Sequence, residues 1–151
     1  MSEVPVEEYL CTRLRRAEQA LMAHHEAVLR TYGLTMTQYT VLLTLSRADG
    51  RSGAQLARAC GVSQQSMATV LNGMQTKELI SRKASAAHAK VMIATLTDTG
   101  RDLLDRAYQE VIVLERALTD RFSADEHRQF CEFLDRATAT LVEQTPTAPA
   151  R

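Results

Sequence analysis

The sequence predicts a mainly α-helical (α+β) fold that contains one small β-hairpin. Apolar residues recur at helical spacing over most of the 151 residues. Only between about residues 79 and 96 does the pattern change to short runs rich in β-forming residues. Glycines stand where the helical pattern breaks, at Gly33 and Gly61. Because about 150 residues suffice for one domain, we expect residues 1–151 to form a single domain.

A long amphipathic helix is expected first, over about residues 6–32. Its apolar positions repeat at intervals near 3.6 residues: Leu10, Leu14, Ala17, Leu21, Val28 and Tyr32. Gly33 ends it. Thr35 and Gln38 then have the spacing of a capping box, which predicts a second helix that ends before Asp49.

A short helix over 54–60, a break at Gly61 and an N-capping Ser63 predict a helix-turn-helix with its hinge at 57–62. The second helix of this unit runs to about Lys77. Apolar residues occupy one of its faces: Met67, Val70, Leu71 and Met74. The other face is polar and almost uncharged, with Gln64, Gln65, Ser66, Thr69 and Asn72.

Two short strands, 79–83 and 91–96, predict a hairpin directly after this helix. Asp98 suits the start of a further long helix. Ser123 and Glu126 form another capping-box pattern, which begins the final helix. Its apolar side chains are expected to point inward: Phe130, Phe133, Leu134, Ala137, Leu141 and Val142. The tail, about residues 145–151, is predicted to be disordered.

The net charge of the chain is zero, but the charge is unevenly distributed. The 18 basic side chains balance 18 acidic ones. Residues 51–96 nevertheless hold six basic groups and one acidic group, a net charge of +5, so the remainder carries −5. Such a segment attracts a polyanion even in a neutral protein. The alternative is a solvated face that happens to be basic.

No signature of an enzyme or a metal site was found. The three cysteines have no C-x-x-C spacing, and no two of the four histidines stand four residues apart. Glycine-rich phosphate loops and nucleophile elbows are missing. We therefore expect no catalytic residue, no cofactor and no metal. No apolar run approaches the roughly 20 residues of a membrane span, and the acidic first residues lack the apolar core of a signal peptide, so a cytoplasmic protein without a membrane partner is expected.

The helix-turn-helix points to double-stranded DNA. In such a unit the second helix lies in the major groove and presents its N-terminal residues to the bases, where glutamine suits adenine. Serine and the helix N-terminus suit phosphate, and the basic hairpin would act as a wing in or near the minor groove. The predicted contacts are Ser63, Gln64, Gln65, Ser66, Thr69, Asn72, Arg82, His88 and Lys90. The alternatives are a solvated helix face and a module that docks an acidic protein.

Several stretches resemble the MarR-type winged helix-turn-helix regulators: 33–42, 55–57, 61–66 and 96–100. The resemblance covers about residues 6–143. It implies a homodimeric transcriptional regulator with dimerisation helices at about 6–32 and 98–143. The DNA-binding lobe would span about 35–96 and read a pseudo-palindromic operator. We expect a repressor.

The chain departs from the family pattern at three places. Glu78 precedes the Leu79-Ile80 pair, where the family usually has glycine. His88-Ala89-Lys90 replaces the Asp-x-Arg or Asp-Arg-Arg that the wing tip usually carries, and Thr69 stands where the family often has arginine. The last two changes remove positive charge from the predicted DNA face.

The resemblance also implies an effector, a small aromatic acid or phenolic compound bound between the dimer helices and the DNA-binding lobe. Arginine can pair with a carboxylate through two hydrogen bonds. By position, the candidates are Arg15, Arg16, His24, His25, Tyr32 and Tyr39. The alternative for the arginines is a solvent-facing helix surface.

Cys11 offers another sensor. It stands near the N-terminal end of the first helix, where the peroxide-sensing branch of the family has its reactive cysteine, and reactivity there requires a stabilised thiolate. The alternative is a cysteine that only packs. Cys60 and Cys131 are expected to pack against apolar neighbours.

Overall fold

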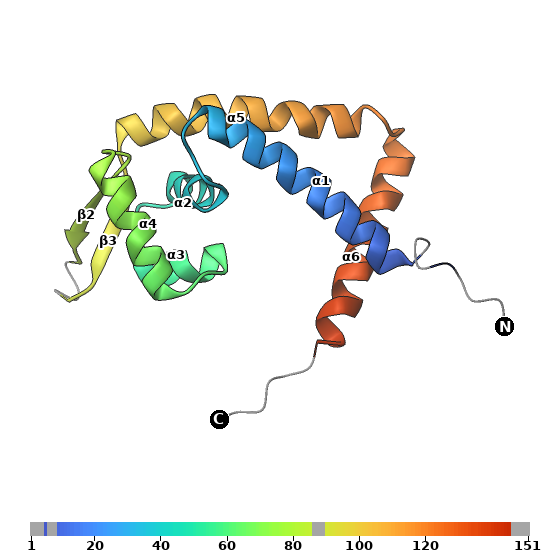
Figure 1. Cartoon of the computed structure of the whole chain (residues 1–151), viewed down its shortest axis with the longest axis horizontal. Helices are drawn as coiled ribbons and strands as arrows, with labels where there is room; N and C mark the ends of the chain where they lie inside the picture. Colours follow the sequence, from blue (N-terminus) through green and yellow to red (C-terminus); the bar gives the residue numbers. More distant parts are fainter. Residues whose placement is uncertain (1–4, 6–8, 86–89, 146–151) are drawn as a thin grey trace. The chain divides into compact units, whose positions relative to one another are not determined.

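A computed structural model describes residues 5, 9–85 and 90–145. The chain divides into two compact units, Met1–Val111 and Ile112–Arg151. The first unit holds a small antiparallel sheet and most of the helices, so the expected mainly α-helical winged fold is confirmed (Figure 1). Helix α5 crosses the boundary between the two units.

The two N-terminal helices form where their capping residues predict. Helix α1 spans Leu10–Thr31, and Gly33 follows it with a φ of 65°. Helix α2 spans Met36–Ser46, and the Thr35 side chain accepts a hydrogen bond from the backbone N–H of Gln38 in a complete capping box. Residues 6–8 of the predicted first helix lie outside the described residues.

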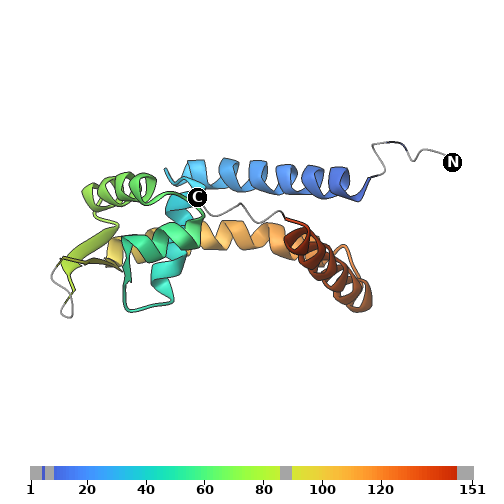
Figure 2. The ribbon, with the colours of Figure 1, turned by 90° about the horizontal axis from the view of Figure 1, so that it is seen from below.

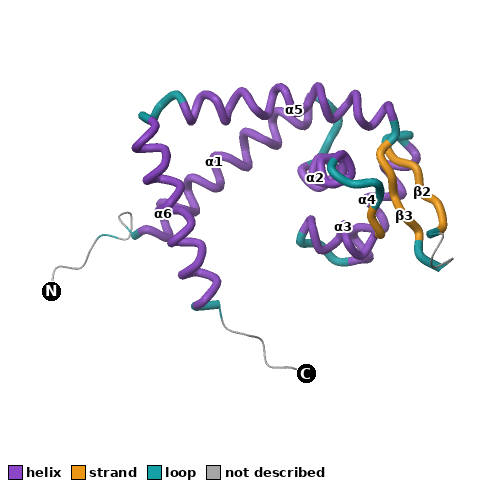
Figure 3. Tube along the Cα trace, turned by 180° about the vertical axis from the view of Figure 1, so that it is seen from behind, coloured by secondary structure: helices purple, strands orange, loops and turns teal. Residues whose placement is uncertain are grey.

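The sheet contains the predicted hairpin and one strand that was not predicted. Strands β1 (Arg51–Ser52), β2 (Ile80–Ala84) and β3 (Met92–Leu96) are antiparallel in the order β1-β3-β2 (Figure 3). The Ser85 N–H donates to the Val91 carbonyl oxygen at 2.7 Å and closes the hairpin. Gly50 precedes β1 with a φ of 132°, and a Cβ there would lie 2.6 Å from Ile93 Cγ2. The missing side chain therefore lets β1 approach β3.

The core of the first unit joins α2, α3, α4 and the sheet. Its fully buried side chains come from every one of these helices and from β2: Val41, Leu42, Leu56, Met67, Met74 and Ile80. Helix α4 packs against both α3 and β2. Figure 2 shows the same helices and strands grouped together from a second direction. This core holds α4 against β2, so the helix and this strand of the hairpin have a fixed relation to each other.

The junction between the hairpin and α5 (Asp98–Thr119) is tightly closed. Thr97 Oγ1 donates to the Glu78 carbonyl oxygen at 2.7 Å and accepts from the Gly100 N–H at 3.0 Å. A Cβ on Gly100 would overlap the carbonyl oxygen of Leu79. Helix α5 therefore begins directly against the turn that leads into β2.

Helix α6 (Ala124–Glu143) begins at the predicted Ser123–Glu126 capping box. The Glu126 carboxylate accepts from the Ser123 N–H and Oγ, both at 2.8 Å, and these hydrogen bonds lower the pKa of Glu126. The expectation that the apolar side chains of α6 point inward is wrong for the single chain. Phe133 is 56% exposed and Val142 69%. Residues 112–145 contain only the end of α5 and α6, too little chain to enclose a core of their own.

Within the described ranges, the helices are all too short or too polar to cross a membrane.

Candidate nucleic-acid interface

Helices α3 (Gly53–Cys60) and α4 (Gln64–Thr76) build the helix-turn-helix. The Ser52 side chain caps α3 in a box with Gln55, which was not predicted. Gly61 ends α3 in the left-handed conformation with a φ of 65°, as expected for a glycine at this position. The Val62 N–H then donates to the Ala57 carbonyl oxygen at 3.1 Å. The chain turns within three residues and enters α4.

The two faces of α4 differ as the sequence predicts. Met67, Leu71 and Met74 are buried and hold the helix on the core. The polar side chains named as DNA contacts are all exposed: Ser63, Gln64, Gln65, Ser66, Thr69 and Asn72. We call these six residues the reading face. It presents hydroxyl and amide groups without a single charge.

The Ser63 hydroxyl caps the N-terminus of α4. Its Oγ accepts from the Ser66 N–H at 3.0 Å and donates to Ser66 Oγ at 2.9 Å. The N–H groups of Gln64 and Gln65 stand in the first turn, where a helix offers no internal acceptor. Together with the positive end of the helix dipole, they suit a phosphate oxygen.

The wing places one basic group, Arg82, against the reading face and carries two further lysines. Arg82 lies in β2, and its Nη1 donates to Asn72 Oδ1 of α4 at 2.6 Å. Lys83 is exposed in the same strand, and Lys90 is exposed at the turn before β3. His88 lies outside the described residues. The structure therefore brings Asn72 and Arg82 together, and sequence reasoning named both without predicting their contact.

The predicted effector residues do not form one cluster. Arg15, Arg16 and His24 are exposed on α1. His25 is half-buried, and burial, with His24 beside it, lowers the pKa of His25. Tyr39 belongs to the core at 7% exposure, and burial, with Tyr108 nearby, raises the pKa of its hydroxyl.

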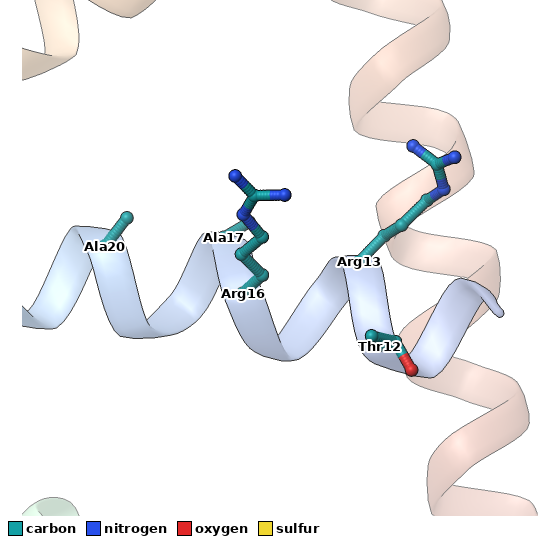
Figure 4. A pocket seen from close by; sticks show the side chains of 5 residues that line it. All are labelled: Thr12, Arg13, Arg16, Ala17 and Ala20. Carbon is teal, nitrogen blue, oxygen red and sulfur yellow. The ribbon is translucent and has the colours of Figure 1, made fainter. Parts of the chain in front are cut away.

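Two open hollows lie along α1 and at its end. The larger, of about 610 Å³, is lined by Thr12, Arg13, Arg16, Ala17 and Ala20. Figure 4 shows the guanidinium groups of Arg13 and Arg16 projecting from the same side of α1. The second, of about 260 Å³, is lined by Glu26, Arg30, Leu34, Thr35 and Met36. The sequence analysis did not name Arg30 as a candidate effector residue. Arg30 stands one helical turn before Gly33, and this position indicated that it lies next to the α1–α2 turn.

The cysteines differ in burial. Cys11 is exposed at the start of α1. Cys60 is half-buried against the core, as expected for a packing residue, and burial raises the pKa of its thiol. Cys131 is exposed, which contradicts its expected packing, because the apolar side of α6 is uncovered in one chain. In the part of the chain that the structure describes, His, Cys, Asp and Glu side chains form no group of three able to hold a metal ion.

Comparisons with known proteins agree on one family. The sequence pattern of the MarR family matches residues 32–90. The HTH-type transcriptional repressor Rv2887 of Mycobacterium tuberculosis is 33% identical over 123 residues, which cover 82% of this chain and 88% of that protein.

Solved structures match over most of the chain. One is the transcriptional repressor CouR bound to a 23-mer DNA duplex, with 25% identity, a TM-score of 0.76, and coverage of 88% of this chain and 94% of that one. Another is Rv2887 in complex with p-aminosalicylic acid, with 32% identity, a TM-score of 0.66, and coverage of 86% and 98%. The helix-turn-helix, the hairpin that follows it and these similarities agree: the chain belongs to the MarR family of winged-helix transcriptional regulators.

Proposed function

We propose that this protein is a homodimeric repressor that binds a pseudo-palindromic operator and is released from it by a small aromatic acid. The observation that carries the proposal is the reading face of α4, exposed and uncharged beside the basic wing. A solvated helix face usually carries charged residues, whereas amides and hydroxyls suit the hydrogen-bonding edges of bases. The similarity to CouR, whose structure contains a DNA duplex, supports the same partner.

The charge distribution supports DNA as the partner. The six basic groups of residues 51–96 lie on β1, on α3, at the C-terminal cap of α4 and on the hairpin, which are the elements next to the reading face in the sequence. Among the described residues of this segment, Arg51, Arg58, Lys77, Lys83 and Lys90 are exposed. Because such cations neutralise phosphates and release counterions, we expect binding to weaken steeply with salt.

Exposed apolar side chains support a homodimer. Phe130, Phe133, Leu141 and Val142 of α6 are each about half exposed or more. Phe122 stacks on Phe130 with ring centroids 5.5 Å apart, yet both rings remain accessible. A second copy of the chain would cover this apolar side, and two reading faces would then meet two operator half-sites.

We place the effector in the hollow beside Arg30. Its guanidinium can pair with a carboxylate, and Leu34 and Met36 offer apolar contact to a ring. The hollow adjoins Gly33, whose carbonyl oxygen accepts a hydrogen bond from Lys77 Nζ at 3.3 Å. Since Lys77 caps the C-terminus of α4, a ligand here would act close to the helix that reads DNA. The similarity to Rv2887, whose structure contains p-aminosalicylic acid, supports this ligand class.

The test measures fluorescence anisotropy with duplexes from the DNA flanking the protein's own gene and with a shuffled duplex of the same composition. We expect Gln65→Ala to reduce the ratio of the two affinities roughly tenfold, because a lost amide–base pair removes discrimination. Lys90→Ala should weaken both complexes alike and lower the salt slope by about 1. p-Aminosalicylic acid should release the wild-type complex.

Three outcomes would contradict the proposal. If Gln65→Ala lost affinity equally for both duplexes, Gln65 would not contact a base in a sequence-specific way. A complex that p-aminosalicylic acid leaves intact would overturn the effector assignment. No sequence-specific complex at low salt without effector would favour a module that docks an acidic protein.

A further inference from the structure

One contact ties the reading face to the wing. Arg82 Nη1 of β2 donates to Asn72 Oδ1 of α4 at 2.6 Å, although the two residues are ten positions apart. Within the described residues, by contrast, Gln64 and Gln65 make no side-chain hydrogen bond at all. Asn72 is therefore held in one orientation, while the two glutamines remain free to turn.

The chemistry of the contact fixes which end of the Asn72 amide is occupied. A guanidinium group carries only donors, so the amide must turn its oxygen toward Arg82. A short hydrogen bond to a charged donor is also stronger than one between neutral groups. The Asn72 oxygen is thus engaged, and its Nδ2, which carries two donors, remains available on the exposed side of the residue.

This occupancy changes what Asn72 can read. An asparagine with a free amide suits adenine, because it donates to N7 and accepts from N6. The Arg82 hydrogen bond takes one of the two acceptor positions of the Asn72 oxygen and directs that oxygen toward the wing, so Nδ2 is the group that Asn72 presents most freely to a base. Donors alone can satisfy both major-groove acceptors of guanine, O6 and N7, whereas adenine presents one acceptor, N7, beside a donor, N6, that needs the Asn72 oxygen.

We propose that Arg82 is a positioning residue that sets the base preference of Asn72, shifting it from adenine toward guanine, which presents two acceptors. The inference rests on the proposed DNA-binding function. Arg82 acts here through Asn72, so its loss changes which base is preferred. A phosphate contact would change only how tightly every sequence is bound.

The test selects duplexes from a random pool with the full-length protein and sequences the bound fraction. Asn72→Ala identifies the operator position that depends on Asn72, where the wild type should enrich guanine. Arg82→Met keeps the apolar stem but frees the Asn72 oxygen. We expect the adenine-to-guanine ratio at that position to rise about tenfold, while positions that depend on Gln65 keep their preference.

Asn72→Asp provides a second variant that does not depend on removing Arg82. Its carboxylate still accepts from Arg82 but has no donor, so the guanine preference should disappear while the wing stays attached. Thermal unfolding of each variant verifies the fold.

The outcomes separate this inference from the proposed function. If the wild type enriches a consensus and Arg82→Met weakens all sequences alike without changing any base preference, the positioning role is overturned. Retention of the preference in Asn72→Asp would overturn it as well. If the wild type enriches no sequence, the proposed function itself fails, and the inference fails with it.

Discussion

Glu78 holds a backbone conformation that suits glycine. Its φ is 57°, in the left-handed region where a side chain costs roughly 1 kcal/mol or more. Two hydrogen bonds hold it there. Its N–H donates to the Gln75 carbonyl oxygen at 2.9 Å, and its own carbonyl accepts from Thr97 Oγ1 at 2.7 Å. These two hydrogen bonds therefore keep the turn between α4 and β2 in a backbone conformation that glutamate by itself disfavours.

Replacing Glu78 by glycine should stabilise the protein. Glu78→Gly removes about 1 kcal/mol of backbone strain, which corresponds to a rise in Tm of roughly 2–4 °C for a chain of this size. Glu78→Gln is the matched control, because it removes the same charge and keeps the strained backbone. Calorimetry measures the Tm of the two variants. An equal rise in Tm in both would show that the removed charge, and not the relieved backbone strain, causes the stabilisation.

At the level of elements, most helix boundaries could be predicted because their signals are local. Thr35, Ser63 and Ser123 cap helices within three residues of their own position, and Gly61 ends α3 by its own conformation. The hairpin was predicted from its β-rich composition, because its strands are long enough to show a pattern. The helix caps, Gly61 and the β-rich strands together were enough to predict that the reading face comes before the wing in the sequence.

The features that sequence reasoning missed depend on tertiary contacts. Strand β1 has two residues, too few to show any periodicity, and it exists because it pairs with β3. The Asn72–Arg82 hydrogen bond joins two elements that only the folded core brings together. The apolar stripe of α6 was predicted correctly as a stripe, but one sequence does not show whether its own chain or a second copy covers it.

Two glycine-to-alanine changes should have opposite effects on stability. At Gly50 an added Cβ would collide with Ile93 Cγ2 and the φ of 132° is unfavourable, so Gly50→Ala should lower the free energy of unfolding by about 1–3 kcal/mol. At Gly73 a Cβ meets nothing within 4 Å, so Gly73→Ala should raise it by about 1 kcal/mol. Urea unfolding measures both. A loss of stability in Gly73→Ala would show that α4 needs its glycine for folding.

At the scale of the whole molecule, charge and apolar surface are divided between different segments. Residues 51–96 carry +5 and the remainder −5, so the zero net charge hides a basic lobe. The exposed phenylalanines, by contrast, all lie between 122 and 133. One segment thus suits a polyanion and the other suits an apolar partner. The two surfaces can be altered independently, because the substitutions that test one leave the other unchanged.

Phe133→Glu should convert the proposed dimer into a monomer. Phe133 is 56% exposed in one chain, so its replacement should scarcely alter the stability of the chain itself, while a charge in an apolar dimer interface is costly. Arg136, whose guanidinium lies 5.8 Å from the Phe133 ring, can pair with the new carboxylate and preserve the helix. Sedimentation should show the monomer, and operator affinity should fall because one reading face meets only one half-site.

Ala139→Glu is the control: Ala139 is exposed and lies two residues from both Ala137 and Leu141, on the opposite side of α6, so this variant should remain dimeric. A dimeric Phe133→Glu protein would place the subunit contact elsewhere.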